Sequence, residues 1–140
     1  MNDRFIKLFT DFNAFLIRIT NGKVGSQLGT QSVLILTTVG RKTGELRSTP
    51  IAYFEHDGRY LLVGSNWGRQ KQADWYFNLK KQPRASIQLG GKTLNVHARE
   101  ADGAEYQQLW RYVTKQHPPY VHHQQMTSRR IPILVLEPSR

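Results

Sequence analysis

The residues with the clearest chemical potential lie in a short turn, Gly40-Arg41-Lys42-Thr43-Gly44. Two cationic side chains and a hydroxyl are adjacent there, and the flanking glycines can adopt conformations that leave backbone N–H groups facing a ligand. Such a turn can bind an anion, for example a phosphate or a carboxylate. Taken alone, the same pattern also fits a solvated hairpin tip with ordinary surface charges.

The rest of the sequence offers few side chains for acid–base or nucleophilic catalysis. It has no cysteine and no GxSxG or HExxH motif, and its carboxylates are scattered. The histidines at 117, 122 and 123 lack the frame of a metal site, so we predict no metal. Cations, backbone donors and aromatic rings suit a flat, anionic cofactor that carries its own reactivity. They also suit the stacking of nucleic acid bases on a small barrel.

The overall charge points to an anionic partner. Twenty Lys and Arg against ten Asp and Glu give a net charge of +10, with no long run of cations. No apolar run reaches the roughly 18 residues of a membrane span. The start of the chain does not read as a signal peptide, and cysteines are absent. These features predict a cytoplasmic protein.

Alternating and β-branched runs predict six strands, beginning with two that flank the cationic turn. Their connections are mostly short, glycine-containing turns, which indicates antiparallel hairpins that close into a barrel with helices at its periphery. The expected strands are 33–39, 46–55, 59–64, 85–89, 92–99 and 131–136.

Three helices are predicted from apolar spacing of three and four residues, at 3–19, 74–81 and 103–116. Asp102 and Glu105 have the spacing of a capping box at the start of the last one. The segments 65–73 and 117–130 are expected to be irregular.

We therefore expect a single domain with two parts: an N-terminal amphipathic helix over 1–22 and a barrel over 23–140. The phenylalanine-rich stripe of the first helix can pack on the barrel or on a partner subunit. Because Arg4, Lys7 and Arg18 lie near it, the stripe can also rest on an anionic membrane surface.

Four motifs in this order resemble one family: LTTVGRKTGELRSTP at 36–50, LLVGS at 61–65, DWYFNLKKQP at 74–83 and RRIPILVLEP at 129–138. The chain is similar to deazaflavin-dependent nitroreductases of the flavin and deazaflavin oxidoreductase superfamily. The resemblance covers most of the chain, and the first and third motifs together are specific.

The resemblance implies an α+β, mainly β fold, the FMN-binding split β-barrel of about six antiparallel strands. It also implies an enzyme that uses reduced coenzyme F420, an 8-hydroxy-5-deazaflavin with a negatively charged tail of phosphate and glutamates. That cofactor would transfer hydride to a quinone, a nitroaromatic compound or another electrophilic acceptor. Further expectations are a homodimer and peripheral contact with the inner face of the membrane through the N-terminal helix.

The resemblance also assigns site residues. Those expected to bind the cofactor come from the cationic turn, the strand after it, the loop after 64 and the helix at 74–81. They are Gly40, Arg41, Lys42, Thr43, Pro50, Ala52, Ser65, Asn66, Arg69, Lys71, Trp75 and Asn78. Tyr120 and His123 are expected in the acceptor pocket, with Tyr120 as a candidate proton donor.

One departure from the family pattern concerns the cofactor. The chain has Asn66-Trp67 where relatives carry Lys-Gly, so a cation that binds the tail is lost unless Arg69 or Lys71 replaces it. FMN is therefore retained as an alternative cofactor. A basic nucleic-acid-binding barrel is the third reading, which the small number of strand aromatics (Tyr53, Phe54 and Tyr60) disfavours.

Overall fold

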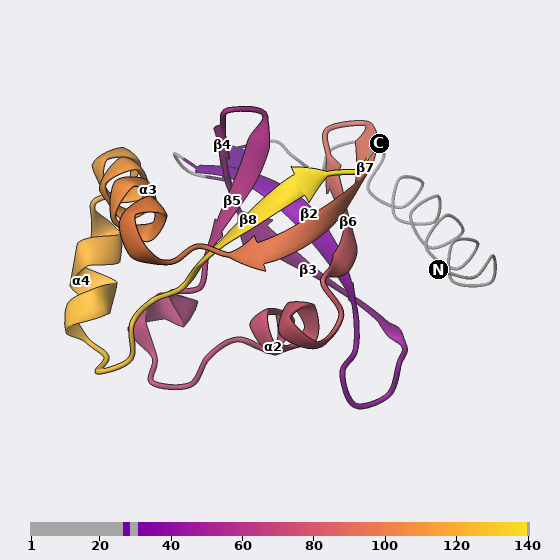
Figure 1. Ribbon diagram of the computed structural model, residues 1–140, viewed down its shortest axis with the longest axis horizontal. Coiled ribbons are helices and arrows are strands. Elements are labelled where there is room, and N and C mark those ends of the chain that lie inside the picture. The colour runs from indigo at the N-terminus through magenta and orange to yellow at the C-terminus, as the bar shows by residue number, and fades with distance from the viewer. Residues whose placement is uncertain (1–26, 29–30, 140) are drawn as a thin grey trace.

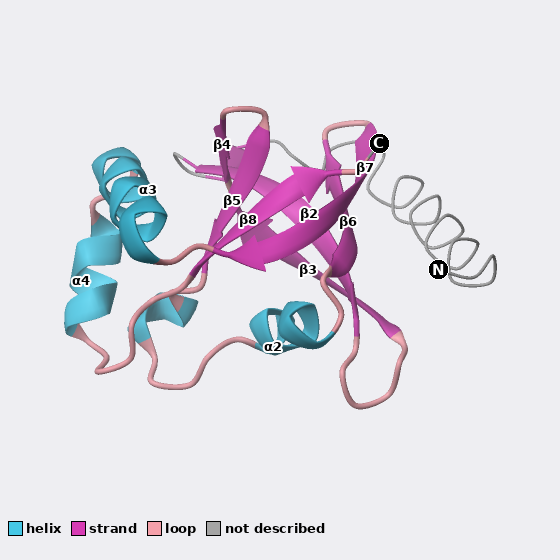
Figure 2. Ribbon diagram, viewed as in Figure 1, coloured by secondary structure: helices cyan, strands magenta, loops and turns pink. Residues whose placement is uncertain are grey.

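The computed structural model describes residues 27–28 and 31–139 of the chain. Within them the protein is mainly β, with strands that curl into a half-barrel and helices at its periphery (Figures 1 and 2). This confirms the predicted fold class. The expected N-terminal helix at 3–19 lies outside the described residues.

Eight strands are found in the described residues where about six were expected. The predicted strand at 46–55 is two strands, because residues 46–52 pair with the strand before them and residues 54–56 pair with the strand after them. Tyr53 lies between the two, and its N–H donates to the carbonyl of Ser32 at 3.0 Å. A two-residue strand precedes the first predicted one. The strands are β1 (Gln27–Leu28), β2 (Gln31–Val39), β3 (Leu46–Ala52), β4 (Phe54–His56), β5 (Arg59–Val63), β6 (Arg84–Leu89), β7 (Lys92–Glu100) and β8 (Ile133–Pro138).

All the strand pairs are antiparallel, in the order β1-β2-β6-β7-β8-β5-β4, with β3 paired to β2 as well. The β2–β3 hairpin is in register from Val33 opposite Ala52 to Val39 opposite Leu46. β3 pairs with one neighbour only in the described part of the chain, and this edge position tolerates Pro50, which has no N–H for a second partner. The hairpin thereby projects the cationic turn at its tip.

The core lies on both sides of the sheet. One cluster fills the barrel and includes the fully buried Leu34, Leu36 and Leu62. Trp75, in the helix at Asp74–Lys81, packs against this cluster. The other cluster lies under the two later helices and includes Leu61, Ile133 and Val135. Consecutive residues of β5 enter opposite clusters because side chains alternate across a strand.

Four helical segments are described: η1 (Asn66–Gly68), α2 (Asp74–Lys81), α3 (Gly103–Gln116) and α4 (Pro119–Gln125). α2 and α3 confirm the predicted helices. α3 and α4 lie together on one flank of the barrel (Figure 1). None of the helices in this part of the chain is long and apolar enough to cross a membrane.

The expectation that 65–73 and 117–130 are irregular was wrong in part, because η1 and α4 form there. α4 begins at Pro119, whose fixed φ suits the first helical turn and whose missing N–H is not needed there. A proline at this position therefore starts a helix inside the segment that was expected to be irregular.

The predicted capping box is also wrong. Asp102 is the N-cap of α3, but its side chain makes no capping hydrogen bond. Glu105 instead accepts two hydrogen bonds from Arg99 of β7, at 2.6 and 2.9 Å. A bidentate, charge-assisted contact is stronger than a bond to a neutral backbone N–H, so the carboxylate turns toward the sheet.

Candidate functional site

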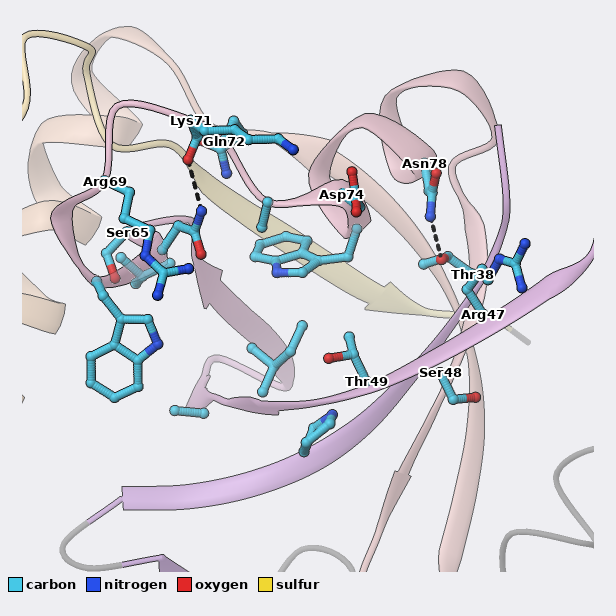
Figure 3. Close-up of a pocket in the computed structure, with 18 of the residues that line it drawn as sticks. Thr38, Arg47, Ser48, Thr49, Ser65, Arg69, Lys71, Gln72, Asp74 and Asn78 are labelled. Carbon is cyan, nitrogen blue, oxygen red and sulfur yellow. Dashed lines mark hydrogen bonds between the residues drawn. The ribbon is translucent and has the colours of Figure 1, made fainter. Parts of the chain in front are cut away.

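A cavity of about 780 Å³ opens between β3, the loop after β5, α2 and α4. Its wall combines the β2–β3 turn, one side of β3, the loop 65–73, the start of α2 and aromatic side chains near α4 (Figure 3). All fourteen residues that the sequence assigned to the cofactor or the acceptor line it. Segments from four regions of the sequence therefore meet in one place.

Further lining residues were not predicted. Thr38, Arg47, Ser48 and Thr49 come from the β2–β3 hairpin, and Figure 3 shows Thr38 and Arg47 near Asn78 at one end of the pocket. The polar run RSTP inside a predicted strand was the signal that this part of β3 is not buried on both faces and can line a cavity. Trp67, Gln72, Asp74 and His117 also line it.

The cationic turn is closed by its own hydrogen bonds. Gly40 N–H donates to the Glu45 carbonyl at 2.7 Å, and Gly44 N–H donates to the Gly40 carbonyl at 2.8 Å. The backbone N–H of Arg41 donates to Asn78 Oδ1, and the backbone N–H of Glu45 donates to Thr43 Oγ1, both at 3.1 Å. The sequence predicted that backbone N–H groups of this turn face a ligand. That prediction was wrong for these four N–H groups, because each already donates a hydrogen bond, three within the hairpin tip and that of Arg41 to Asn78.

Glycine is required in this turn for reasons of shape. Gly44 has φ +77°, a conformation that side chains disfavour, and a Cβ at Gly40 would lie 3.1 Å from the Glu45 carbonyl oxygen and from Thr43 Oγ1. The turn thus places Lys42 at the cavity while keeping the hairpin tip compact.

Arg41 is fastened to α2. Its Nη1 donates to Asn78 Oδ1 at 3.0 Å, its Nη2 pairs with Asp74 Oδ1 at 3.2 Å, and its guanidinium lies 5.2 Å from the centre of the Phe77 ring. Asn78 is buried and donates in turn to Thr38 Oγ1 at 3.2 Å (Figure 3). Arg41 and Asn78 therefore stabilise the wall of the cavity by joining the β2–β3 hairpin to α2, and both residues also line the cavity.

Three other cations face the cavity without a protein partner for their side chains among the described residues: Lys42, Arg69 and Lys71. Figure 3 shows Arg69 and Lys71 on the loop, at the end of the pocket away from Arg47. Asn66 is used within the loop, since its Nδ2 donates to the Lys71 carbonyl at 2.7 Å. These lysines and arginines give the cavity a strongly positive rim.

The α4 end of the cavity is aromatic. Tyr120 is buried, and its ring centre lies 4.7 Å from that of His117 and 6.0 Å from that of His123. Burial lowers the pKa of both histidines below the ordinary histidine range, and for His123 the nearby His117 and His122 lower it further. Both imidazoles are therefore neutral at pH 7.

No group of three or more His, Cys, Asp or Glu side chains within the described ranges is arranged to hold a metal ion. The cavity therefore offers cations, hydroxyls and planar side chains as its binding groups. A planar ligand with an anionic extension fits this donor set.

A model of the F420H(2)-dependent quinone reductase family matches residues 11–138. The chain belongs to this family. It is 35% identical over 125 residues to an F420H(2)-dependent quinone reductase of Mycobacterium tuberculosis, a match that covers 86% of this chain and 84% of that protein.

Solved structures agree with the family assignment. An F420-H2 dependent reductase superposes with a TM-score of 0.69 and 38% identity, covering 75% of this chain and 93% of that one. A chain described as a domain-swapped dimer gives a TM-score of 0.72 and 32% identity, covering 91% and 98%. A pyridoxamine 5'-phosphate oxidase-like protein of Listeria innocua, at 10% identity and a TM-score of 0.54, shares the fold alone.

Proposed function

We propose that this protein is an oxidoreductase that binds reduced coenzyme F420 and transfers a hydride from it to a quinone or a related electrophilic acceptor. The observation that carries the proposal is the convergence of the motif residues on one cavity, in a chain that belongs to a family of quinone reductases. Asp74 is the one carboxylate among the described residues that line the cavity, so these residues offer no carboxylate pair, which fits chemistry supplied by a cofactor.

The residues present fit this cofactor. Lys42, Arg69 and Lys71 would hold the negatively charged tail, because no carboxylate of the described residues pairs with them. Pro50, Ala52 and Trp75 supply apolar surface for a flat ring. When bound, the reduced deazaflavin supplies a hydride from its ring.

The protein's own contribution to the reaction is placement and proton supply. The walls of β3 and α2 exclude water from the reacting face and orient the acceptor. Reduction of a quinone carbonyl leaves negative charge on oxygen, which a neighbouring hydroxyl or imidazole N–H can stabilise. We propose Tyr120 as the proton donor, with His123 beside it in the acceptor pocket.

The decisive experiment compares F420 with FMN in fluorescence titrations of the purified protein, followed by turnover with menadione as the quinone. We expect submicromolar F420 binding, weaker FMN binding and F420-dependent loss of menadione. Lys42→Gln should weaken F420 binding, whereas Lys92→Gln, at the start of β7 and away from the cavity, should not.

Other outcomes of the same titrations would change the assignment. A preference for FMN would keep the cavity but make the protein a flavin-dependent reductase. If neither cofactor binds and duplex DNA binds in a salt-sensitive, sequence-independent manner, the basic barrel is a nucleic-acid-binding module instead.

We further propose that residues 1–22 form an amphipathic helix that joins the barrel of 23–140 in one domain and contacts the inner face of the membrane peripherally. Removing residues 1–20 should abolish sedimentation with anionic liposomes, and unchanged sedimentation would leave the helix a packing role. A homodimer is proposed because a relative forms one by domain swapping. Light scattering after size-exclusion chromatography measures this state directly.

A further inference from the structure

The tip of the loop after β5 holds an unusual backbone. Asn66 and Trp67 have φ of 46° and 61°, and Gly68 follows with φ of 80°. Asparagine and glycine tolerate this left-handed region, whereas a bulky aromatic residue there is a strained outlier. Such a conformation persists only where the surroundings enforce it.

The strained residue also has an unusual environment. The Trp67 side chain lines the cavity but is 73% exposed, the most exposed large apolar side chain of the described part of the chain. Its ring centre lies 6.1 Å from that of His123, in an edge-to-face arrangement. One face of the indole is therefore open toward solvent and the aromatic end of the cavity, where a planar ligand can stack on it.

A single side chain from another part of the molecule holds this loop in place. Arg129 donates from Nη1 to the Gly64 carbonyl at 3.0 Å, from Nη2 to the Ser65 carbonyl at 2.8 Å and from Nε to the Arg69 carbonyl at 3.0 Å. Its Nη1 also donates to Gln72 Oε1. The guanidinium thus binds the loop on both sides of Trp67.

Two further contacts hold the same loop against the segment after α4. Gln70 binds Thr127 Oγ1 and the backbone N–H of Ser128, the latter at 2.7 Å. A Cβ on Gly68 would lie 3.0 Å from Met126 Sδ and 3.1 Å from the His123 carbonyl oxygen, so the backbone approaches α4 as closely as a glycine allows. The loop and α4 form one unit.

We propose that Trp67 contacts the planar acceptor and determines which acceptors the cavity takes, and that Arg129 is the positioning residue that holds Trp67 there. The inference rests on the proposed function and adds the acceptor side of the site to it. A ligand that stacks on the ring explains why an exposed indole is held in a strained backbone conformation. It also explains why the Arg129 guanidinium binds this loop, although it could otherwise have formed an ion pair. Acceptors with a broad, flat ring system should gain the most affinity from this contact.

The test uses the full-length protein with menadione, which has two fused rings, and with 1,4-benzoquinone, which has one. Trp67→Ala should raise the KM for menadione about three- to tenfold, the range expected for loss of an aromatic pair, and should change the KM for benzoquinone less. The Kd for F420, measured by fluorescence without turnover, should change less than twofold. Trp67→Phe should restore most of the menadione affinity.

The positioning role is tested by a pair of adjacent arginines. Arg129→Lys keeps the charge but cannot reach three carbonyls, so it should raise the menadione KM with little change in kcat. Arg130→Lys is the matched control, because Arg130 lies over the Tyr106 ring at 4.1 Å and outside the cavity. In a Trp67→Ala background, Arg129→Lys should have little further effect on KM, since it acts through the missing ring.

Failure of the inference is distinct from failure of the proposed function. If the wild-type protein neither binds F420 nor reduces menadione, the proposed function is wrong and the inference falls with it. If the wild type is active but Trp67→Ala leaves the menadione KM unchanged, or weakens F420 binding as strongly as it raises KM, the acceptor role is wrong. Additive effects of Trp67→Ala and Arg129→Lys would overturn the positioning role.

Discussion

At the scale of single residues, adjacent cations of one turn have different roles. Arg41 binds Asp74 and Asn78 of α2, whereas the Lys42 side chain has no partner among the described residues. Sequence reasoning treated the two as equivalent. A hydrogen-bonded arginine that crosses between elements stabilises the fold, and a free lysine at a cavity contributes mainly to the ligand.

Replacing these cations one at a time should separate the two roles. Arg41→Gln should lower the free energy of unfolding by about 1–2 kcal/mol, because it removes charge-assisted hydrogen bonds to α2. Lys42→Gln should leave stability within about 0.5 kcal/mol and weaken F420 binding by about 1 kcal/mol. Urea unfolding and fluorescence titration measure the two effects. Equal destabilisation by both variants would contradict this division.

Tyr120 is the second residue with a testable role. If its hydroxyl supplies the proton, Tyr120→Phe should lower kcat for menadione about tenfold to a hundredfold, a modest case of general-acid catalysis, without weakening F420 binding. Tyr112→Phe is the control, since its hydroxyl donates to the Glu55 carbonyl at 3.1 Å, away from the cavity. Unchanged turnover in Tyr120→Phe would remove the residue from this role.

The strain at Trp67 makes an independent prediction about stability. Trp67→Gly should raise the free energy of unfolding by up to about 1 kcal/mol, because glycine adopts φ of 61° without strain and the indole is mostly exposed. Asp57→Gly, at φ of 56° in the β4–β5 turn, should change stability much less, because aspartate tolerates this region, and should not raise the menadione KM. Destabilisation by Trp67→Gly in urea unfolding would indicate that the indole packs in the fold.

At the scale of elements, α3 is attached to the sheet by one ionic cluster. Glu105 accepts two hydrogen bonds from Arg99 and lies 3.6 Å from Arg59, while Arg99 also donates to Glu137 at 2.7 Å. Strands β5, β7 and β8 and the helix thus share four charged side chains. The hydrogen bonds from Arg99 are the main cause that lowers the pKa of Glu105.

The lowered pKa of Glu105 gives stability a defined pH dependence. Because the pKa is lower in the folded than in the unfolded state, ionised Glu105 stabilises the fold above the unfolded-state pKa. That contribution is lost as the pH falls through the folded-state pKa. Glu105→Gln should therefore be less stable than the wild type near pH 7, and the difference should shrink below about pH 4. Thermal melting across this range measures it.

Glu45 provides the matched control for this pH series. It is an exposed glutamate 3.6 Å from Arg47 at the hairpin tip, and exposed pairs contribute little to stability. Glu45→Gln should follow the wild-type profile. If the melting temperatures of Glu105→Gln and the wild type differ by the same amount at all pH values, then packing, and not charge, explains the loss of stability.

At the scale of the whole molecule, the net charge of +10 should steer an anionic cofactor to the cavity. The association rate of F420 should fall severalfold as NaCl rises from about 50 to about 500 mM, because the screening length shortens. The dissociation rate should change less, since long-range steering acts mainly on the rate of encounter. Stopped-flow fluorescence separates the two rates, and a salt-independent association rate would contradict long-range steering.

The sequence by itself determined most of the sheet, two of the described helices and fourteen of the residues that line the cavity. Strand alternation and glycine turns are local properties that predicted the strands, whereas the resemblance of the four motifs to one family assigned the fourteen site residues, all of which line one cavity. Their individual assignments to cofactor or acceptor stay predictions. The charge that points to an anionic ligand is likewise a property of composition alone.

Only the tertiary structure decided which partners those residues take. Arg41 donates a hydrogen bond to Asn78 of α2, Glu105 accepts one from Arg99 and does not cap α3, and Arg129 donates to the carbonyl of Ser65. The partners of Arg41 and Arg129 lie 37 and 64 positions away, and Glu105 binds a side chain of β7 six positions before it. In each case the partner belongs to another element, and a charge-assisted bond to it outweighs the local alternative. Long-range hydrogen bonding therefore set the shape of the site, whereas local sequence set its composition.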